Sequence, residues 1–239
     1  MKGEERLLAH PPGHLPSRDS VCFGVGQSTT PVCRFAGTGL SDNHAEAFAE
    51  LLQVLACGEE SAVLVFEHLG NAAPIHADAN VELVRIAAEE QEHERLLRAL
   101  RLSLPTPRPD EALIVSARRL FKLAANRDVG LHLAAIAALD SGLCLILAAL
   151  RRRTGPLAQS GPCNTVLGRI HRDEARHFEC AMRFTKALAP GPAAQEVAVS
   201  IRERLVALLS RRAEAFERLE VNPLRLFGRL RIPPLLDRD

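Results

Sequence analysis

Two short segments of the sequence carry the same pattern, a glutamate followed three residues later by a histidine. They are Glu90 with His93 and Glu174 with His177, and each lies in a stretch with helical composition. Residues three apart on a helix lie on the same face about one turn apart, so each carboxylate and its imidazole point toward one spot. Two such helices, joined by one carboxylate from each of two neighbouring helices, have the donor set for two transition-metal ions.

A single acidic residue within an apolar stripe precedes each pair. Glu59 lies 31 residues before Glu90, and Asp140 lies 34 residues before Glu174. This spacing indicates a weakly repeated helical hairpin, in which each lone acid lies at the same depth as the following pair. An unpartnered Asp140 among leucines would cost several kcal/mol or become protonated, and a dication removes that penalty. The adjacent Glu60 is the alternative to Glu59, and we expect it to be solvated or paired.

Composition favours one soluble helical domain. The chain has 239 residues, 47% of them apolar and only 4% aromatic, with no Trp or Tyr. The formal net charge of +1 gives no field that would recruit nucleic acid or an anionic membrane surface. The longest apolar run, about Leu131 to Leu150, is interrupted by His132 and Asp140, so we expect no membrane span.

Cysteine usage predicts a reducing compartment. The six cysteines are widely spaced and form no Cys-x-x-Cys motif, so a cytoplasmic protein with free thiols is expected. The first residues lack the apolar core of a secretory signal.

Helical periodicity and the positions of Gly and Pro together predict an all-α fold. It is expected to have four main helices, a crossover helix and a further C-terminal helix. Residues 1–41 are rich in Pro, Gly, Ser and Thr and are expected to form an irregular arm, which leaves residues 42–239 as the helical domain. Val81 and Val84 are expected on the inner side of the second helix, and a Pro-rich tail is expected after Leu219. The predicted helices span about Asp42–Leu69, Ala77–Leu102, Ala112–Ala125, Val129–Arg153, Asn164–Ala189 and Ala193–Leu219.

The order of these motifs resembles the ferritin-like di-iron carboxylate superfamily across about Asp42 to Leu188. The run from Asp173 to His177 is similar to the last ligand helix of its non-haem di-iron oxygenase branch, which includes aldehyde-deformylating oxygenases and amine N-oxygenases. Gly58-Glu59, with Phe66 seven residues later, resembles the first ligand helix of rubrerythrin-like members. The resemblance implies six metal ligands, with Glu90 and Glu174 bridging the ions: Glu59, Glu90, His93, Asp140, Glu174 and His177.

The resemblance further implies two iron ions, O2 as co-substrate and an external electron donor such as a ferredoxin or a reductase. The expected activity is that of a di-iron oxidoreductase of the monooxygenase type, oxidising a small hydrophobic or aromatic substrate. Manganese in place of iron is an alternative at either metal position. A homodimer formed through the final helix is a further alternative to a monomer. Phe66 and Leu147 stand where the family commonly has Tyr, which makes radical chemistry on the protein itself less favoured.

Two other classes of function stay open from the sequence. One is a rubrerythrin-like peroxidase or iron-handling protein without an organic substrate, although no rubredoxin-like four-cysteine domain is present. The other is a metal-free interaction bundle. Among the remaining histidines, His132 and His171 are candidates to support the metal site from outside it, whereas Asp173 and Glu179 are expected to meet water or arginine.

Overall fold

The computed structural model describes residues 37–72, 77–124 and 128–234. The predicted irregular arm therefore lies almost wholly outside the described residues, and the boundary at residue 41 stays a prediction. Every regular element of the described chain is a helix, which confirms the all-α fold class. The helices are α1 (Asp42–Ala72), α2 (Ala77–Arg101), α3 (Glu111–Ala124), α4 (Val129–Leu150), α5 (Pro156–Gln159), α6 (Gly161–Leu188), α7 (Gly191–Ser210), α8 (Ala213–Arg218) and α9 (Pro223–Leu230).

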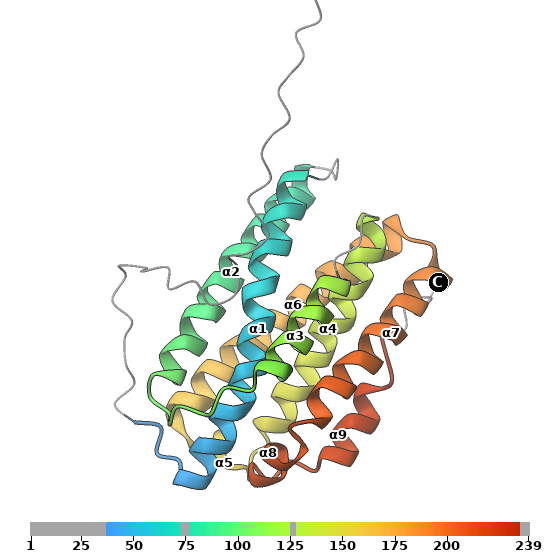
Figure 1. The fold of residues 1–239 in the computed structure, drawn as a ribbon. Helices are drawn as coiled ribbons and strands as arrows, with labels where there is room; N and C mark the ends of the chain where they lie inside the picture. The colour runs from blue at the N-terminus through green and yellow to red at the C-terminus, as the bar shows by residue number, and fades with distance from the viewer. Residues whose placement is uncertain (1–36, 73–76, 125–127, 235–239) are drawn as a thin grey trace, which may run out of the picture. The chain divides into compact units, whose positions relative to one another are not determined.

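Four long helices form the central bundle. α1 packs against α2 and α4 packs against α6 as two hairpins, and α2 and α6 bring the hairpins together. α1 and α6 run in one direction and α2 and α4 in the other (Figure 1). Because α2 and α4 are parallel, the chain needs a crossover between them, and α3 supplies it, as predicted. α3 and α7 pack on each other beside the bundle, where α3 also contacts α1 and α7 also contacts α4.

Local signals in the sequence set the ends of the two helices of the second hairpin. Asp128 caps α4, since its side chain accepts a hydrogen bond from the Leu131 amide at 2.9 Å. Ser160 caps α6 in the same way, and Pro162 occupies the first turn, where its missing N–H costs nothing. These caps fix where each helix begins.

The apolar core is divided into two clusters along the bundle. One cluster includes Phe66, Leu83 and Ile86, and the larger one includes Phe48, Leu97 and many residues of α4, α6 and α7. The six candidate ligands occupy positions between these clusters along their helices. A polar layer thus lies between two layers of apolar packing, where bulk water has little access.

One wrong prediction concerns the buried face of α2. Val81 and Val84 are exposed, whereas Leu83 and Ile86 are almost fully buried. Leu83 and Ile86 lie seven and four residues before Glu90, so they share its helix face. The true apolar stripe is the one in register with the glutamate and the histidine.

The C-terminal region also differs from the prediction. The single expected helix is broken after Ser210, because Arg212 has φ −119° and ψ 22°, and α8 then turns to pack against α1. The Arg212 guanidinium lies 2.9 Å from the Asp110 carboxylate, which holds this corner in place. The expected Pro-rich tail contains α9, in which Asn222 is the N-cap and Pro223 begins the helix instead of breaking it.

α4 is long and apolar enough to cross a membrane by length and composition alone. About 61% of its apolar window is nevertheless buried inside the bundle, as in the core helix of a soluble protein.

Gly130 permits the close approach of α4 to the end of α6. A Cβ at this position would lie 2.8 Å from the backbone of Leu188, which is shorter than any normal contact. We expect Gly130→Ala to lower the free energy of unfolding by about 1–3 kcal/mol through overpacking. Gly161→Ala is the matched control, since nothing lies within 4 Å of its added Cβ. Urea denaturation of both variants measures the difference, and equal stabilities would contradict the packing account.

Candidate metal centre

All six predicted ligands are buried, and they come from four different helices. Glu59 lies on α1, Glu90 and His93 on α2, Asp140 on α4, and Glu174 and His177 on α6. The most exposed of them, Asp140, retains 9% of its accessible surface, and both imidazoles are fully buried. The sequence pattern therefore identified side chains that point into the bundle instead of toward solvent.

His93 faces three of the carboxylates through one ring nitrogen. Its Nδ1 lies 3.3 Å from Glu59 Oε2, 3.3 Å from Glu90 Oε2 and 3.3 Å from Glu174 Oε1. One donor atom from each of these four residues fits within a region in which no two atoms are more than 4.8 Å apart. This is the size of the space that one metal ion and its ligands occupy.

His177 provides the second half of the cluster. Its Nδ1 lies 2.9 Å from Glu90 Oε1 and 3.6 Å from Glu174 Oε1, and its ring centroid lies 5.7 Å from that of His93. Glu90 therefore directs one oxygen toward each imidazole, and Glu174 Oε1 lies between them. Glu90 and Glu174 occupy the positions from which a carboxylate could contact two ions at once.

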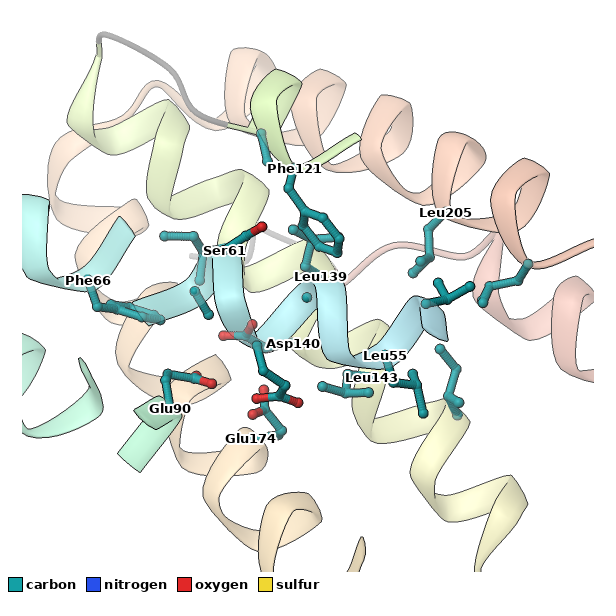
Figure 2. A pocket seen from close by; sticks show the side chains of 18 of the residues that line it. Leu55, Ser61, Phe66, Glu90, Phe121, Leu139, Asp140, Leu143, Glu174 and Leu205 are labelled. Atoms are coloured by element: carbon teal, nitrogen blue, oxygen red, sulfur yellow. The ribbon is translucent and has the colours of Figure 1, made fainter. Parts of the chain in front are cut away.

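Asp140 completes the set from the side of α4. In Figure 2 the carboxylates of Asp140, Glu90 and Glu174 point toward one another across the bundle. The pKa of Asp140 is raised well above its ordinary value, first by burial and then by the nearby charge of Glu174, with His177 acting in the opposite direction. Asp140 thus lies in the same electrostatic cluster, although it is outside the tight group formed around His93.

The cluster contains more hydrogen-bond acceptors than the donors of the described residues satisfy. Within the described chain, the ion-pair partners of Glu59, Glu90 and Glu174 are histidines only, and no lysine or arginine neutralises them. A buried polar atom that lacks a good hydrogen bond is costly, and more so when it is charged. Five buried atoms at the cluster make no hydrogen bond of good geometry, although four of them lie within 3.6 Å of one another or of Glu90: Glu59 Oε2, His93 Nδ1, Asp140 Oδ2, Glu174 Oε1 and His177 Nδ1. Four carboxylates and two imidazole nitrogens around one space are a donor set that suits iron or manganese.

Two outer carboxylates hold the imidazoles in place, a role that was not predicted for either of them. His93 Nε2 lies 3.1 Å from Asp173 Oδ2, and His177 Nε2 lies 2.8 Å from Glu89 Oε2. Each contact crosses between α2 and α6, and Arg176 joins the two acids at 3.0 Å and 2.8 Å. The prediction that Asp173 meets water or arginine is confirmed by Arg176, whereas its contact with His93 was not predicted.

The outer contacts determine which histidine nitrogen is available to a metal. A carboxylate only accepts hydrogen bonds, so Nε2 of each ring carries a proton and donates it outward. In the neutral imidazole this leaves the lone pair on Nδ1, which faces the cluster. The signal in the sequence was a longer repeat, because an acidic residue directly precedes each Glu-x-x-His.

Without cations, the cluster retains protons. Burial acts to lower the pKa of His177, but the Glu174 and Glu90 carboxylates outweigh it and raise this pKa to about 11. The pKa of His93 is raised for the same reason. The pKa of Glu59 is also raised, by burial and by the neighbouring carboxylate of Glu90. These protons occupy positions at which metal ions would bind.

We therefore expect metal affinity to increase with pH. Metal ions need deprotonated ligands, so each displaced proton makes affinity about tenfold tighter per pH unit while the raised pKa of that ligand lies above the pH. Titration of the protein with Mn²⁺ against a competing chelator at several pH values measures this slope. His171→Ala is the control, since His171 lies outside the cluster. A slope that His177→Ala leaves unchanged would contradict the prediction.

A cavity of about 90 Å³ adjoins the carboxylates, and neither outer acid lines it. It is lined by Glu59, Glu90, Asp140 and Glu174, and by apolar side chains from α1, α3, α4 and α7. Figure 2 shows Phe66 on one side of the acids and Leu55, Leu143 and Leu205 on the other. The imidazoles of the cluster therefore contact the outer acids, whereas its carboxylates border the cavity.

The remaining candidates separate into two groups. His132 is buried and lines the cavity, whereas the half-buried His171 contacts the Arg151 guanidinium at 3.3 Å and does not join the cluster. Among the described cysteines, Cys57, Cys163 and Cys180 are buried free thiols and Cys144 is a half-buried one.

Comparisons with known proteins do not assign the chain to a family. No protein-family model matches the chain, and neither the curated proteins nor the solved structures that were searched contain a match.

Proposed function

We propose that the protein is a ferritin-like, non-haem di-iron oxidoreductase that uses O2 to oxidise a small organic substrate. One observation carries this proposal: Glu90 and Glu174 lie between two buried imidazoles, and among the described residues no lysine or arginine pairs with the surrounding acids. Two divalent ions would balance the four carboxylates while both imidazoles stay neutral. Such a pair of ions would supply the electrons and the Lewis acidity needed to activate O2.

The residues of the chain would then have separate roles. Glu59 and His93 would hold one ion, Asp140 and His177 the other, and Glu90 and Glu174 would be shared. Asp173 and Glu89 would keep each imidazole in the tautomer that presents Nδ1. The apolar lining next to the acids would exclude water and hold the substrate.

The cavity favours an oxygenase over an enzyme that only consumes peroxide. A peroxidase or iron-handling protein needs room for a small polar molecule or a path for ions. Here the space beside the carboxylates is lined on α1, α3, α4 and α7 by apolar side chains that include eight leucine, isoleucine and valine residues. This lining suits a carbon-based substrate.

Anaerobic reconstitution with Fe²⁺ followed by exposure to O2 tests the proposal. We expect about two iron ions per chain, by analogy with the donor count, and reduction of O2 in a single turnover. Consumption of peroxide without any organic product, or growth of an iron mineral, would favour the rubrerythrin-like or iron-handling alternative. Binding of less than one equivalent of iron per chain would favour the metal-free interaction bundle.

A further inference from the structure

Arg202 of α7 is a buried cation at the interface between α7 and α4. The residue retains 2% of its accessible surface, and its side chain extends over α4 at Gly142. A Cβ at position 142 would lie 2.9 Å from Arg202 Nη1, so the glycine leaves room for the guanidinium group. None of the six candidate metal ligands pairs with this guanidinium, which places it outside the metal cluster.

Among the described residues, the hydrogen-bond partner of this guanidinium is a neutral hydroxyl. Arg202 Nη2 donates to Ser141 Oγ at 3.2 Å, and that hydroxyl donates in turn to the Ala137 carbonyl at 2.6 Å. Arg202 Nε and Nη1 are buried and make no hydrogen bond within the described chain. No carboxylate of the described residues forms an ion pair with Arg202. Most of its five N–H donors are therefore left without an acceptor by this part of the chain.

The charge on Arg202 persists at neutral pH. Burial lowers the pKa of Arg202 to about 10, which is still well above 7. The ionisable neighbour that acts on it is Cys144, one helical turn after Ser141 on the same face of α4. Burial and the Glu174 and Asp140 carboxylates raise the pKa of this thiol to about 12, so it is neutral at pH 7. A buried charge without a partner is strongly destabilising, so the interface needs an anion.

The chemistry of the interface selects the kind of anion. Arg202 carries one positive charge and the Ser141 hydroxyl is neutral, so a dianion would leave a second buried charge without a partner. The planar guanidinium fork binds planar oxyanions through two parallel hydrogen bonds, which a spherical ion cannot accept. Ser141 and Cys144 are only half-buried, so ions from solvent have access to this face of α4.

We propose that Arg202, held by Ser141, binds a small planar monovalent oxyanion between α4 and α7. Carboxylate and nitrate ions share this chemistry. The bound anion stabilises the packing of α7 on α4, because it supplies the negative charge that Arg202 lacks among the described residues. This site does not rest on the proposed function.

Thermal unfolding of the metal-free full chain in sodium formate or sodium nitrate at pH 7 tests this proposal. The sodium salt of a bulky sulfonate buffer keeps the ionic strength constant. We expect Tm to rise by about 3–5 °C for every tenfold increase in formate above its Kd, and nitrate should act in the same way. Chloride is spherical and sulfate is a dianion, so both should need at least about tenfold higher concentrations for the same shift.

Variants of Arg202 assign the effect to this side chain. Arg202→Met should abolish the dependence of Tm on formate. Without formate it should melt at or above the wild-type temperature, because an apolar side chain replaces an unpaired buried ion. Arg204→Met is the matched control, since Arg204 is exposed on the same helix, and it should keep the wild-type dependence. Arg202→Lys keeps the charge without the planar fork, so it should respond equally to chloride and formate.

Three results would overturn the proposal. The first is a wild-type Tm that formate and nitrate do not change, and the second is a formate dependence that persists in Arg202→Met or is lost in Arg204→Met. The third is an Arg202→Met variant that melts below the wild type without formate, which would show that Arg202 is already paired. If Arg202→Met does not fold, a preference of Arg202→Lys for formate over chloride overturns the planar site. None of these measurements uses a metal ion, so failure of the metal chemistry is recognised separately.

Discussion

Glu174→Ala is expected to abolish O2 reduction by the iron-loaded protein and to leave at most one ion bound per chain. Glu174 Oε1 lies between the two imidazoles, at 3.3 Å from His93 Nδ1 and 3.6 Å from His177 Nδ1. A carboxylate in this position would be a ligand to both ions, so its loss would weaken both. Because supporting residues around metal sites already change affinity by 10–100-fold, loss of a shared ligand should cost more than about 100-fold.

The metal content of purified, reconstituted protein and its rate of O2 consumption measure this effect. Glu179→Ala is the matched control, since it removes the same charge from an exposed position on the same helix. Asp173→Asn should have an effect between those of Glu174→Ala and Glu179→Ala. We expect its metal affinity to fall about 10–100-fold and its number of bound ions to stay unchanged. If Glu174→Ala binds two ions as tightly as the wild type, the assignment of a shared ligand fails.

Metal binding is expected to raise the thermal stability of the wild type by about 5–10 °C. A ligand at about 100 times its Kd stabilises the native state by about 2.7 kcal/mol. For a domain of 150–250 residues, each kcal/mol shifts Tm by about 2–4 °C. Five buried polar atoms at the cluster make no hydrogen bond of good geometry, and bound cations would give them partners.

Asp140→Asn should have the opposite effects on the two forms. It removes a buried acid whose pKa is raised by burial and by Glu174, so the metal-free protein should become more stable by about 1–2 kcal/mol. It also removes one ligand, so the increase in Tm on adding Mn²⁺ should shrink. Differential scanning calorimetry with and without Mn²⁺ measures both changes. Glu111→Gln, at the exposed start of α3, should change neither, and a metal-free Asp140→Asn that melts below wild type would contradict this account.

The candidate ligands were accessible from the sequence because their signal is local. Glu90 and His93 share a helix face by their spacing alone, and Asp140 was conspicuous as an acid within an almost wholly apolar helix. Helical periodicity predicts the direction in which such residues point, and burial follows from their neighbours. The fold class was accessible for the same reason.

The outer acids could not be assigned because their partners lie on another helix. Glu89 and Glu90 are adjacent, so their side chains point about 100° apart around α2. Which residue of α6 the side chain of Glu89 meets depends on how closely the two helices approach and at what register. Only the tertiary structure pairs Glu89 with His177 and Asp173 with His93.

The errors in α2 and α9 have local physical reasons. The apolar Val81 and Val84 suggested a buried stripe, but the helix face is fixed by Glu90 and His93, which leaves both valines exposed. Pro223 suggested a tail, although a proline directly after an asparagine N-cap begins a helix. In each case the position of the residue along the helix determined its environment, whereas its residue type alone did not.

The central claim is that one cage of six side chains holds two cations with Glu90 and Glu174 between them. Crystals of the iron-reconstituted protein, with diffraction data collected at the iron absorption edge, test it most directly. The account predicts two anomalous peaks about 3.5–4 Å apart within the cluster, one beside His93 and one beside His177. A single peak, or peaks outside the space enclosed by the carboxylates, would contradict it.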